Sequence, residues 1–270
     1  MKDMSHKKPA KSAREYIDDL ASRGRYQFTV EDFANAREST VVAARAALRR
    51  LGEHGTIAMP YRGFLVIVPP EYRALGCLPP EQFIPQLMDY LNEPYYVGLL
   101  SAARYYGAAH QAPQTFQIMT KRNRKPITCG KIRVDFVAKN SGVNTLTTPF
   151  NTQRGVIMVS TPEATALDLV GYQQHCGGLD HVATVLGELS EKLSSQKLAD
   201  AAALVPIPWV QRLGYLLHLV GAKAKATSLQ KMIERQNPPI TPLQPGIPVR
   251  GSEKDRDFRV ALNSDVEPDK

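Results

Sequence analysis

The stretch from Thr29 to Val68 reads TVEDFANARESTVVAARAALRRLGEHGTIAMPYRGFLVIV and decides the fold of the N-terminal part of the chain. Thr29 is a good N-cap for a short helix over Val30–Ala34. A tight polar turn at residues 35–38 follows, and then a longer helix that ends near Leu51 or Gly52. Two helices separated by so short a turn predict a helix-turn-helix.

The end of the same stretch predicts a hairpin. Two short apolar runs, Thr56–Met59 and Phe64–Val68, are joined by Pro60-Tyr61-Arg62-Gly63, where proline and glycine favour a turn. Upstream, Ser12 can cap a further helix over Ala13–Ser22, which would complete a three-helix core. This order of helices and hairpin predicts a winged helix-turn-helix, whose second helix enters a DNA groove and whose hairpin is the wing.

The second helix of the motif has two different sides at about 100° per residue. Val41, Ala44, Leu48 and Leu51 share the side that we expect to pack on the first two helices. The other side has small residues first and arginines later, which suits close approach to a groove and contact with phosphates or guanine. An alanine-rich helix with solvated arginines would look the same, and the hairpin behind it favours DNA binding. The expected DNA contacts, with the last two at the wing tip, are Arg37, Ser39, Thr40, Ala43, Arg45, Arg49, Arg50, Tyr61 and Arg62.

Length and composition fit a folded protein that meets a polyanion. The 270 residues are 43% hydrophobic and carry a formal net charge of +8, with a pI near 9.4. Three cysteines, far apart and without a CxxC pair, predict neither a disulfide framework nor a zinc site and suit a reducing cytosol. Neither a membrane-spanning apolar run nor a secretory signal is evident, so we expect a cytoplasmic protein without a membrane partner.

The chain divides by composition into five parts, and its fold class is predicted as α+β, a winged helix-turn-helix followed by a larger mixed α/β domain. We expect a flexible basic arm at 1–11, the winged helix-turn-helix at 12–70, a linker at 71–80 between two Pro-Pro pairs, the second domain at 81–263 and a loose acidic tail at 264–270.

Within the second domain, apolar spacing predicts helices and strands in a mixed order. We expect helices over 81–91 and 96–107, a helix opened by Thr161-Pro162-Glu163, and helices over 179–193, 196–203, 208–219 and 224–234. Strands are expected over 115–119, 131–137, 155–159 and 257–263. Between the first two strands lies a basic loop, a possible second nucleic-acid contact, with Lys121, Arg122, Arg124 and Lys125.

No strong catalytic constellation is present in the sequence, and no metal or cofactor is expected. Asp135, Glu163 and Lys139 could imitate a metal-dependent nuclease site, although Asp135 alternates outward on a strand and Glu163 stands where a helix favours an acid anyway. A second alternative is a transcription factor whose second domain senses a ligand. We expect a protein that is not an enzyme.

Five stretches follow one another along the chain: RGFLVIVPPEY, YYVGLLSAARYYGAAHQAPQTFQIMT at Tyr95–Thr120, IRVDFVAK, VSTPEATALDLV and DFRVALN. As an ordered set they resemble the motifs of AbiEi-type antitoxins of abortive-infection toxin–antitoxin systems, also described as transcriptional regulators of viral defence. The resemblance implies that the winged helix binds inverted repeats in its own promoter and represses its operon. It further implies that the second domain counteracts a nucleotidyltransferase-like toxin in a type IV system, in which no stable complex is required. It implies neither a cofactor nor catalytic residues.

Overall fold

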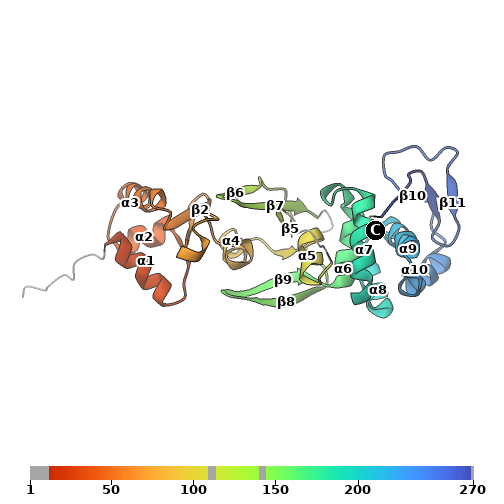
Figure 1. The fold of residues 1–270 in the computed structure, drawn as a ribbon, viewed down its shortest axis with the longest axis horizontal. Helices are drawn as coiled ribbons and strands as arrows, with labels where there is room; N and C mark the ends of the chain where they lie inside the picture. The colour runs from red at the N-terminus through yellow and green to blue at the C-terminus, as the bar shows by residue number, and fades with distance from the viewer. Residues whose placement is uncertain (1–11, 109–113, 140–143, 269–270) are drawn as a thin grey trace, which may run out of the picture. The chain divides into compact units, whose positions relative to one another are not determined.

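The computed structural model of the protein describes residues 12–108, 114–139 and 144–268. They form two compact units, the first made of Met1–Pro94, Lys125–Asp135 and Asn151–Ile157, and the second of Tyr95–Arg124, Phe136–Phe150 and Met158–Lys270. Helices and several sheets follow one another along the chain (Figure 1), so the predicted α+β class is confirmed. The expected basic arm at 1–11 lies outside the described residues.

The first unit begins with the predicted winged helix-turn-helix. Its elements are α1 (Ala13–Ser22), β1 (Gln27–Thr29), α2 (Val30–Ala36), α3 (Val41–Glu53), β2 (Ile57–Tyr61) and β3 (Phe64–Ile67). The strands form an antiparallel sheet in the order β1-β3-β2, so the hairpin gains a third strand that the sequence did not predict. Phe64–Ile67 is buried on both faces, because Leu65 and Ile67 lie in the core of the winged helix while Phe64 packs against the ring of Tyr90.

Capping and aromatic packing explain why these helices form where they do. Ser12 with Glu15 and Thr29 with Asp32 each make a reciprocal capping box at the start of α1 and α2. Tyr16 packs edge-on against Phe28 and Phe33, at centroid distances of 5.7 and 5.2 Å. This cluster joins α1, β1 and α2 into one core.

The first unit continues beyond the hairpin into segments that come from far along the sequence. It includes two 3-10 turns, η1 (Pro70–Tyr72) and η2 (Pro80–Gln82), then α4 (Ile84–Tyr90), β6 (Ile127–Cys129) and the turn Gln153–Arg154. Within residues 71–80, which were expected to be a linker, Cys77 and Leu78 have no exposed surface. These residues therefore pack as part of the first unit.

A six-stranded sheet contains the strands of the middle of the chain, in the order β6-β7-β5-β4-β9-β8. Its further strands are β4 (Tyr95–Val97), β5 (Phe116–Thr120), β7 (Ile132–Ala138), β8 (Thr147–Thr152) and β9 (Gly155–Ser160). β4 is antiparallel to β5 and parallel to β9. The strand predictions for β5, β7 and β9 are confirmed to within a residue or two, whereas β4, β6 and β8 were not predicted.

The prediction of a helix over 96–107 is wrong at its start. Tyr96 and Val97 belong to strand β4, and the helix α5 runs over Leu99–Tyr105. Gly98 separates the two, and a Cβ added there would lie 2.5 Å from Cγ of Met119. The apolar run VGLLSAA hides this break because a buried strand and a buried helix have the same composition.

Helices dominate the remainder of the second unit. They are α6 (Pro162–Gly171), η3 (Gln173–His175), α7 (Leu179–Leu189), η4 (Ser190–Lys192), α8 (Ser195–Ala202), α9 (Ile207–Leu219) and α10 (Lys223–Gln236). α6 is buried from Glu163 to Val170, so it forms the centre of this unit. A small sheet, β10 (Thr241–Pro242), β12 (Val260–Leu262) and β11 (Glu253–Asp255), ends the fold. None of the described helices is long and apolar enough to cross a membrane.

Candidate nucleic-acid interface

Helix α3 presents the side that the sequence predicted for DNA. Ala44 and Leu48 are buried, whereas Val42 is 77% exposed. The side chains of Ala43, Arg45, Arg49 and Arg50 are also exposed. Thr40 caps the helix, with its hydroxyl accepting the N–H of Ala43 at 3.2 Å. Val41 and Leu51, expected to be packed, are only partly covered: Val41 is 37% exposed and Leu51 half-buried.

The two arginines at the end of α3 differ in their surroundings. The Nε of Arg49 lies 3.7 Å from a carboxylate oxygen of Glu53, and both side chains are largely exposed. A pair of this kind contributes little to stability and is easily exchanged for a phosphate. Arg50 lies in the last turn of the helix and is exposed.

The turn between α2 and α3 uses two of the predicted DNA contacts in its own structure. The guanidinium of Arg37 lies over the ring of Phe33, 5.3 Å from its centroid. The hydroxyl of Ser39 donates to the carbonyl of Ala34 at 3.5 Å, and Glu38 adopts a left-handed backbone with φ of 48°. These contacts orient the start of α3, and a role of Arg37 and Ser39 in DNA binding stays a prediction.

The turn at the tip of the wing contains fewer residues than the sequence predicted. Pro60 and Tyr61 belong to β2, so the turn consists of Arg62 and Gly63. Gly63 has φ of +83°, and a Cβ there would lie 2.9 Å from the hydroxyl of Tyr90, so the turn requires glycine. Arg62 is exposed at the tip, whereas Tyr61 is half-buried before it.

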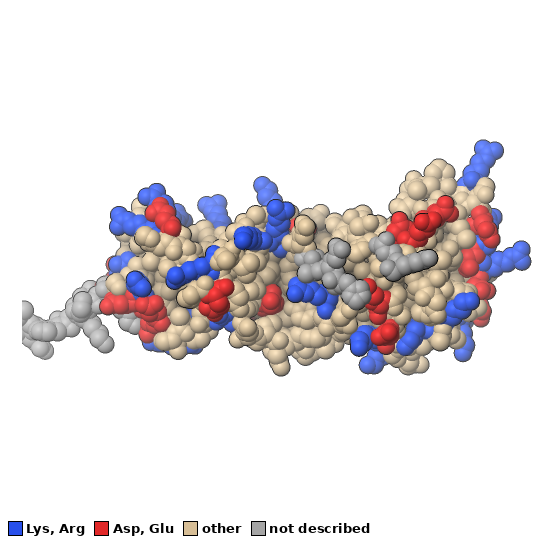
Figure 2. Space-filling model, in the orientation of Figure 1, with Lys and Arg blue, Asp and Glu red and all other residues tan. Residues whose placement is uncertain are grey.

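An apolar groove of about 470 Å³ lies between α3 and the wing strands. Its floor includes Val30, Leu48 and Leu65, and Arg45 and Arg49 also line it. Figure 2 shows basic side chains standing over α3 and over the neighbourhood of β6 in the first unit. The first unit thus presents positive charge along the helix that the sequence assigned to DNA.

The basic loop between β5 and β6 is solvent-accessible. Lys121, Arg122 and Lys125 are exposed and Arg124 is half-buried. The hydroxyl of Thr120 donates to the carbonyl of Arg122 at 2.8 Å, which fixes the first turn of the loop. A nucleic-acid contact by this loop stays a prediction.

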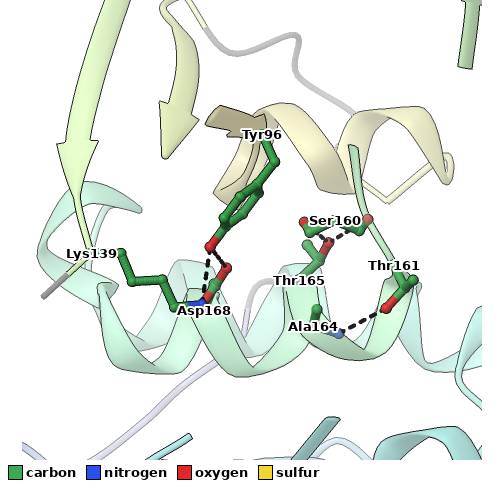
Figure 3. Close-up of polar contacts among 7 residues, drawn as sticks. All are labelled: Tyr96, Lys139, Ser160, Thr161, Ala164, Thr165 and Asp168. Atoms are coloured by element: carbon green, nitrogen blue, oxygen red, sulfur yellow. Dashed lines mark hydrogen bonds and ion pairs between the residues drawn. The ribbon is translucent and has the colours of Figure 1, made fainter. Parts of the chain in front are cut away.

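A buried polar cluster in the second unit was not predicted (Figure 3). The ammonium of Lys139 lies 2.9 Å from one carboxylate oxygen of Asp168 and 3.0 Å from the hydroxyl of Tyr96, which donates to the other carboxylate oxygen at 2.7 Å. All three residues are at most 2% exposed. Burial raises the pKa of Asp168 from its usual value, and Lys139 opposes this rise. The alternation of polar and apolar residues gave no sign that α6 turns Asp168 inward.

This cluster leaves the nuclease hypothesis without support. Lys139 is engaged with Asp168 and Tyr96, and a carboxylate oxygen of Glu163 accepts the backbone N–H of Ser194 at 2.9 Å. Among the residues that the structure describes, no three His, Cys, Asp or Glu side chains are grouped to hold a metal ion. Lys139 and Glu163 therefore have structural roles.

Comparison with known proteins agrees with the resemblance. Residues 96–219 match the family described as the AbiEi antitoxin C-terminal domain. The structure is similar to the crystal structure of the RV2827C protein from Mycobacterium tuberculosis, with a TM-score of 0.64, 17% identity and coverage of 93% of this chain and 94% of that one. That likeness shows a shared fold. The solution structure of the antibiotic-resistance factor ANT(2'')-Ia matches at 12% identity over 44% of this chain and 85% of that one, with a TM-score of 0.30. No curated protein matches the sequence.

Proposed function

From the match of residues 96–219 to the AbiEi antitoxin C-terminal domain family, we propose that the chain is an antitoxin that also represses transcription of its own operon. The winged helix at the N-terminus would bind inverted repeats in the promoter, and the second unit would counteract a nucleotidyltransferase-like toxin. The observation that carries the DNA-binding half is the exposed side of α3, with Ala43 near its start and Arg49 and Arg50 near its end. The family match carries the antitoxin half.

In this proposal α3 lies in the major groove. The small side chain of Ala43 allows close approach of the helix backbone, while Arg45, Arg49 and Arg50 reach phosphates or guanine edges. Arg62 at the tip of the wing would contact the backbone beside the groove. Arg37, Ser39, Thr40 and Tyr61 complete the proposed contact set.

Binding to the chain's own upstream DNA tests the DNA-binding half. We expect Arg49→Ala with Arg50→Ala to weaken binding and to reduce the slope of log K against log salt by about 2, about 1 for each lost phosphate contact. The matched control, Lys231→Ala with Arg235→Ala, removes the same charge from the exposed side of α10. Equal affinities of the wild type and the α3 variant would show that α3 is not the recognition helix.

The proposal includes a second DNA contact, made by the basic loop, which can be tested separately from the contact made by α3. Replacing Lys121, Arg122, Arg124 and Lys125 by glutamine should lower the affinity for operator DNA without changing which sequence is preferred, because phosphate contacts carry no sequence information. If the folded variant bound operator DNA with unchanged affinity, these side chains would contact solvent and not DNA.

The antitoxin half is tested in cells that express a nucleotidyltransferase-like toxin from the gene next to the gene of this protein. The measurement is whether this protein restores growth. We expect the α3 variant to rescue growth as well as the wild type, because rescue belongs to the second unit. The α3 variant would then lose operator binding while it keeps the ability to rescue growth. Failure of the wild type to rescue any such toxin would refute the antitoxin half and leave the DNA-binding half intact.

A further inference from the structure

Two cysteines that are far apart in sequence meet in the first unit. Their neighbours, Gly76 and Gly130, are in close backbone contact: a Cβ added to Gly130 would lie 2.8 Å from Cα of Gly76. The N–H of Lys131 donates to the carbonyl of Leu75 at 2.7 Å and fixes the same approach. Cys77, directly after Gly76, and Cys129, directly before Gly130, are thereby brought into side-chain hydrogen-bonding contact, and both thiols are free.

The two thiols have unequal surroundings. Cys77 has no exposed surface, whereas Cys129 is half-buried at the end of β6. The hydrogen bond with Cys77 lowers the pKa of Cys129, aided by the backbone of Met59 in the wing strand β2, while burial opposes it. The hydrogen bond with Cys129 and burial raise the pKa of Cys77. An accessible thiol of lowered pKa beside a protonated second thiol is the arrangement of a redox-sensitive pair.

We propose that Cys129 and Cys77 form a modification site at which a hydroperoxide produces an intramolecular disulfide. The thiol of Cys129 reacts with the oxidant to form a sulfenic acid, and the thiol of Cys77 converts this sulfenic acid into the disulfide. The bond would tie the segment after the wing to β6, which packs beside β2. This site is independent of the DNA-binding and antitoxin activities proposed above.

The chemistry balances in two steps. The Cys129 thiolate attacks one oxygen of hydrogen peroxide, the O–O bond breaks, and Cys129 sulfenic acid and hydroxide form. The sulfur of Cys77 then attacks the sulfur of Cys129, and its proton leaves with the departing hydroxide as water. Two thiols lose two electrons in total, and one peroxide becomes two waters.

Treating the reduced full-length protein with hydrogen peroxide tests the site. After the reaction the protein is denatured, alkylated with iodoacetamide and weighed. We expect the alkylated cysteines to fall from three to one, Cys176 alone, and a tryptic map to contain a Cys77–Cys129 cross-link that dithiothreitol removes. Retention of all three alkylation sites, or a cross-link that involves Cys176 or a second chain, would overturn the proposal.

Variants separate the two roles. In Cys77→Ser the sulfenic acid on Cys129 has no resolving thiol, so dimedone should label it severalfold more than in the wild type. Cys129→Ser should leave Cys77 unlabelled, and Cys176→Ser should form the cross-link as the wild type does. Equal dimedone labelling of the wild type and Cys77→Ser would refute the resolving role. The cross-link is measured in the wild-type protein, so the proposal can be tested even if a variant fails to fold.

Discussion

The guanidinium carbon of Arg154 lies over the ring of Tyr26, 3.4 Å from the ring centroid. Arg154 comes from the turn between β8 and β9, and Tyr26 directly precedes β1 of the winged helix. Nε of Arg154 also donates to Gln82 at 2.6 Å, and Gln82 and Tyr72 both donate to Gln153. A cation–π contact and a small network of hydrogen bonds thus hold this turn on the winged helix.

We expect this contact to stabilise the first unit by about 1 kcal/mol, within the range for a partly desolvated cation–π pair. A double-mutant cycle with Tyr26→Leu and Arg154→Ala measures it by denaturant unfolding. Tyr26→Phe keeps the ring and is the control. A coupling energy of zero would show that Gln82 and Gln153 alone hold the turn.

Single substitutions in the buried pair of Lys139 and Asp168 should be severe. Lys139→Met leaves a carboxylate without its counter-ion in a site that is closed to water, and we expect a loss of about 3–5 kcal/mol. Lys139→Met with Asp168→Asn should be much milder, because the amide oxygen still accepts the Tyr96 hydroxyl. Fluorescence of Trp209 during urea unfolding reports on this unit.

The exposed Lys192→Met is the matched control for the pair, and we expect it to change the unfolding free energy by less than about 0.5 kcal/mol. A double variant as unstable as Lys139→Met would contradict the ion-pair explanation. It would assign the loss to the altered shape of the side chain at position 139.

Tyr106 should make the second unit sensitive to alkali. Burial raises the pKa of Tyr106 to about 12, and its hydroxyl donates to the carbonyl of Ser160 at 2.7 Å. The folded state therefore holds this proton more tightly than the unfolded state, whose tyrosine titrates near pH 10. The stability from this group is complete below about pH 10 and is lost as the pH rises toward 12.

Tyr106→Phe has no hydroxyl proton to lose, so its unfolding free energy should fall less steeply between pH 10 and 12 than that of the wild type. Other buried tyrosines, including Tyr96, titrate in both proteins, and the difference between the two curves isolates Tyr106. Parallel curves over this range would contradict the assignment.

The C-terminal segment depends on a glycine in α9. A Cβ at Gly214 would lie 2.2 Å from Cδ1 of Phe258, a side chain that is 2% exposed. We expect Gly214→Ala to displace Phe258 and to cost about 1–3 kcal/mol. Hydrogen exchange of residues 241–262 should then accelerate.

Gly187 in α7 offers the control, because its added Cβ would meet only Cβ of Val220, at 3.9 Å. Gly187→Ala should be neutral or stabilising by up to about 1 kcal/mol, from helix propensity alone. If both alanine variants behaved alike, close packing of Phe258 on α9 would not be the reason that position 214 is glycine.

The winged helix and most helices of the second unit could be predicted because their signals are local. Thr29 and Thr40 cap the helices they precede, and Thr161-Pro162-Glu163 opens α6 as expected. Strand β1 was not predicted, because its three residues are too few to show the alternation of polar and apolar side chains that is typical of a strand. β4 was not predicted because a buried strand beside a buried helix reads as one apolar run.

The long-range contacts could not be predicted, since they depend on the sheet rather than on spacing. Lys139 and Asp168 meet because β7 ends beside α6, and Cys77 meets Cys129 because β6 packs beside β2. In the sequence, Lys139 was one of three residues of the nuclease alternative, and the widely spaced cysteines indicated a reducing cytosol rather than a pair. For the interface, the exposed side of α3 followed from its period, but the use of Arg37 and Ser39 in the turn did not.

The discontinuous make-up of the first unit limits how this protein can be recombined. Residues 1–94 are completed by Lys125–Asp135 and Asn151–Ile157, which lie inside the stretch that matches the antitoxin domain family. A single crossover near residue 95 would therefore join a new winged helix to segments that are fitted to the old one. An exchange of the winged helix must therefore include Lys125–Asp135, with Gly130, and Asn151–Ile157, with Arg154. We expect the N-terminal segment and these two segments from the middle of the chain to change together.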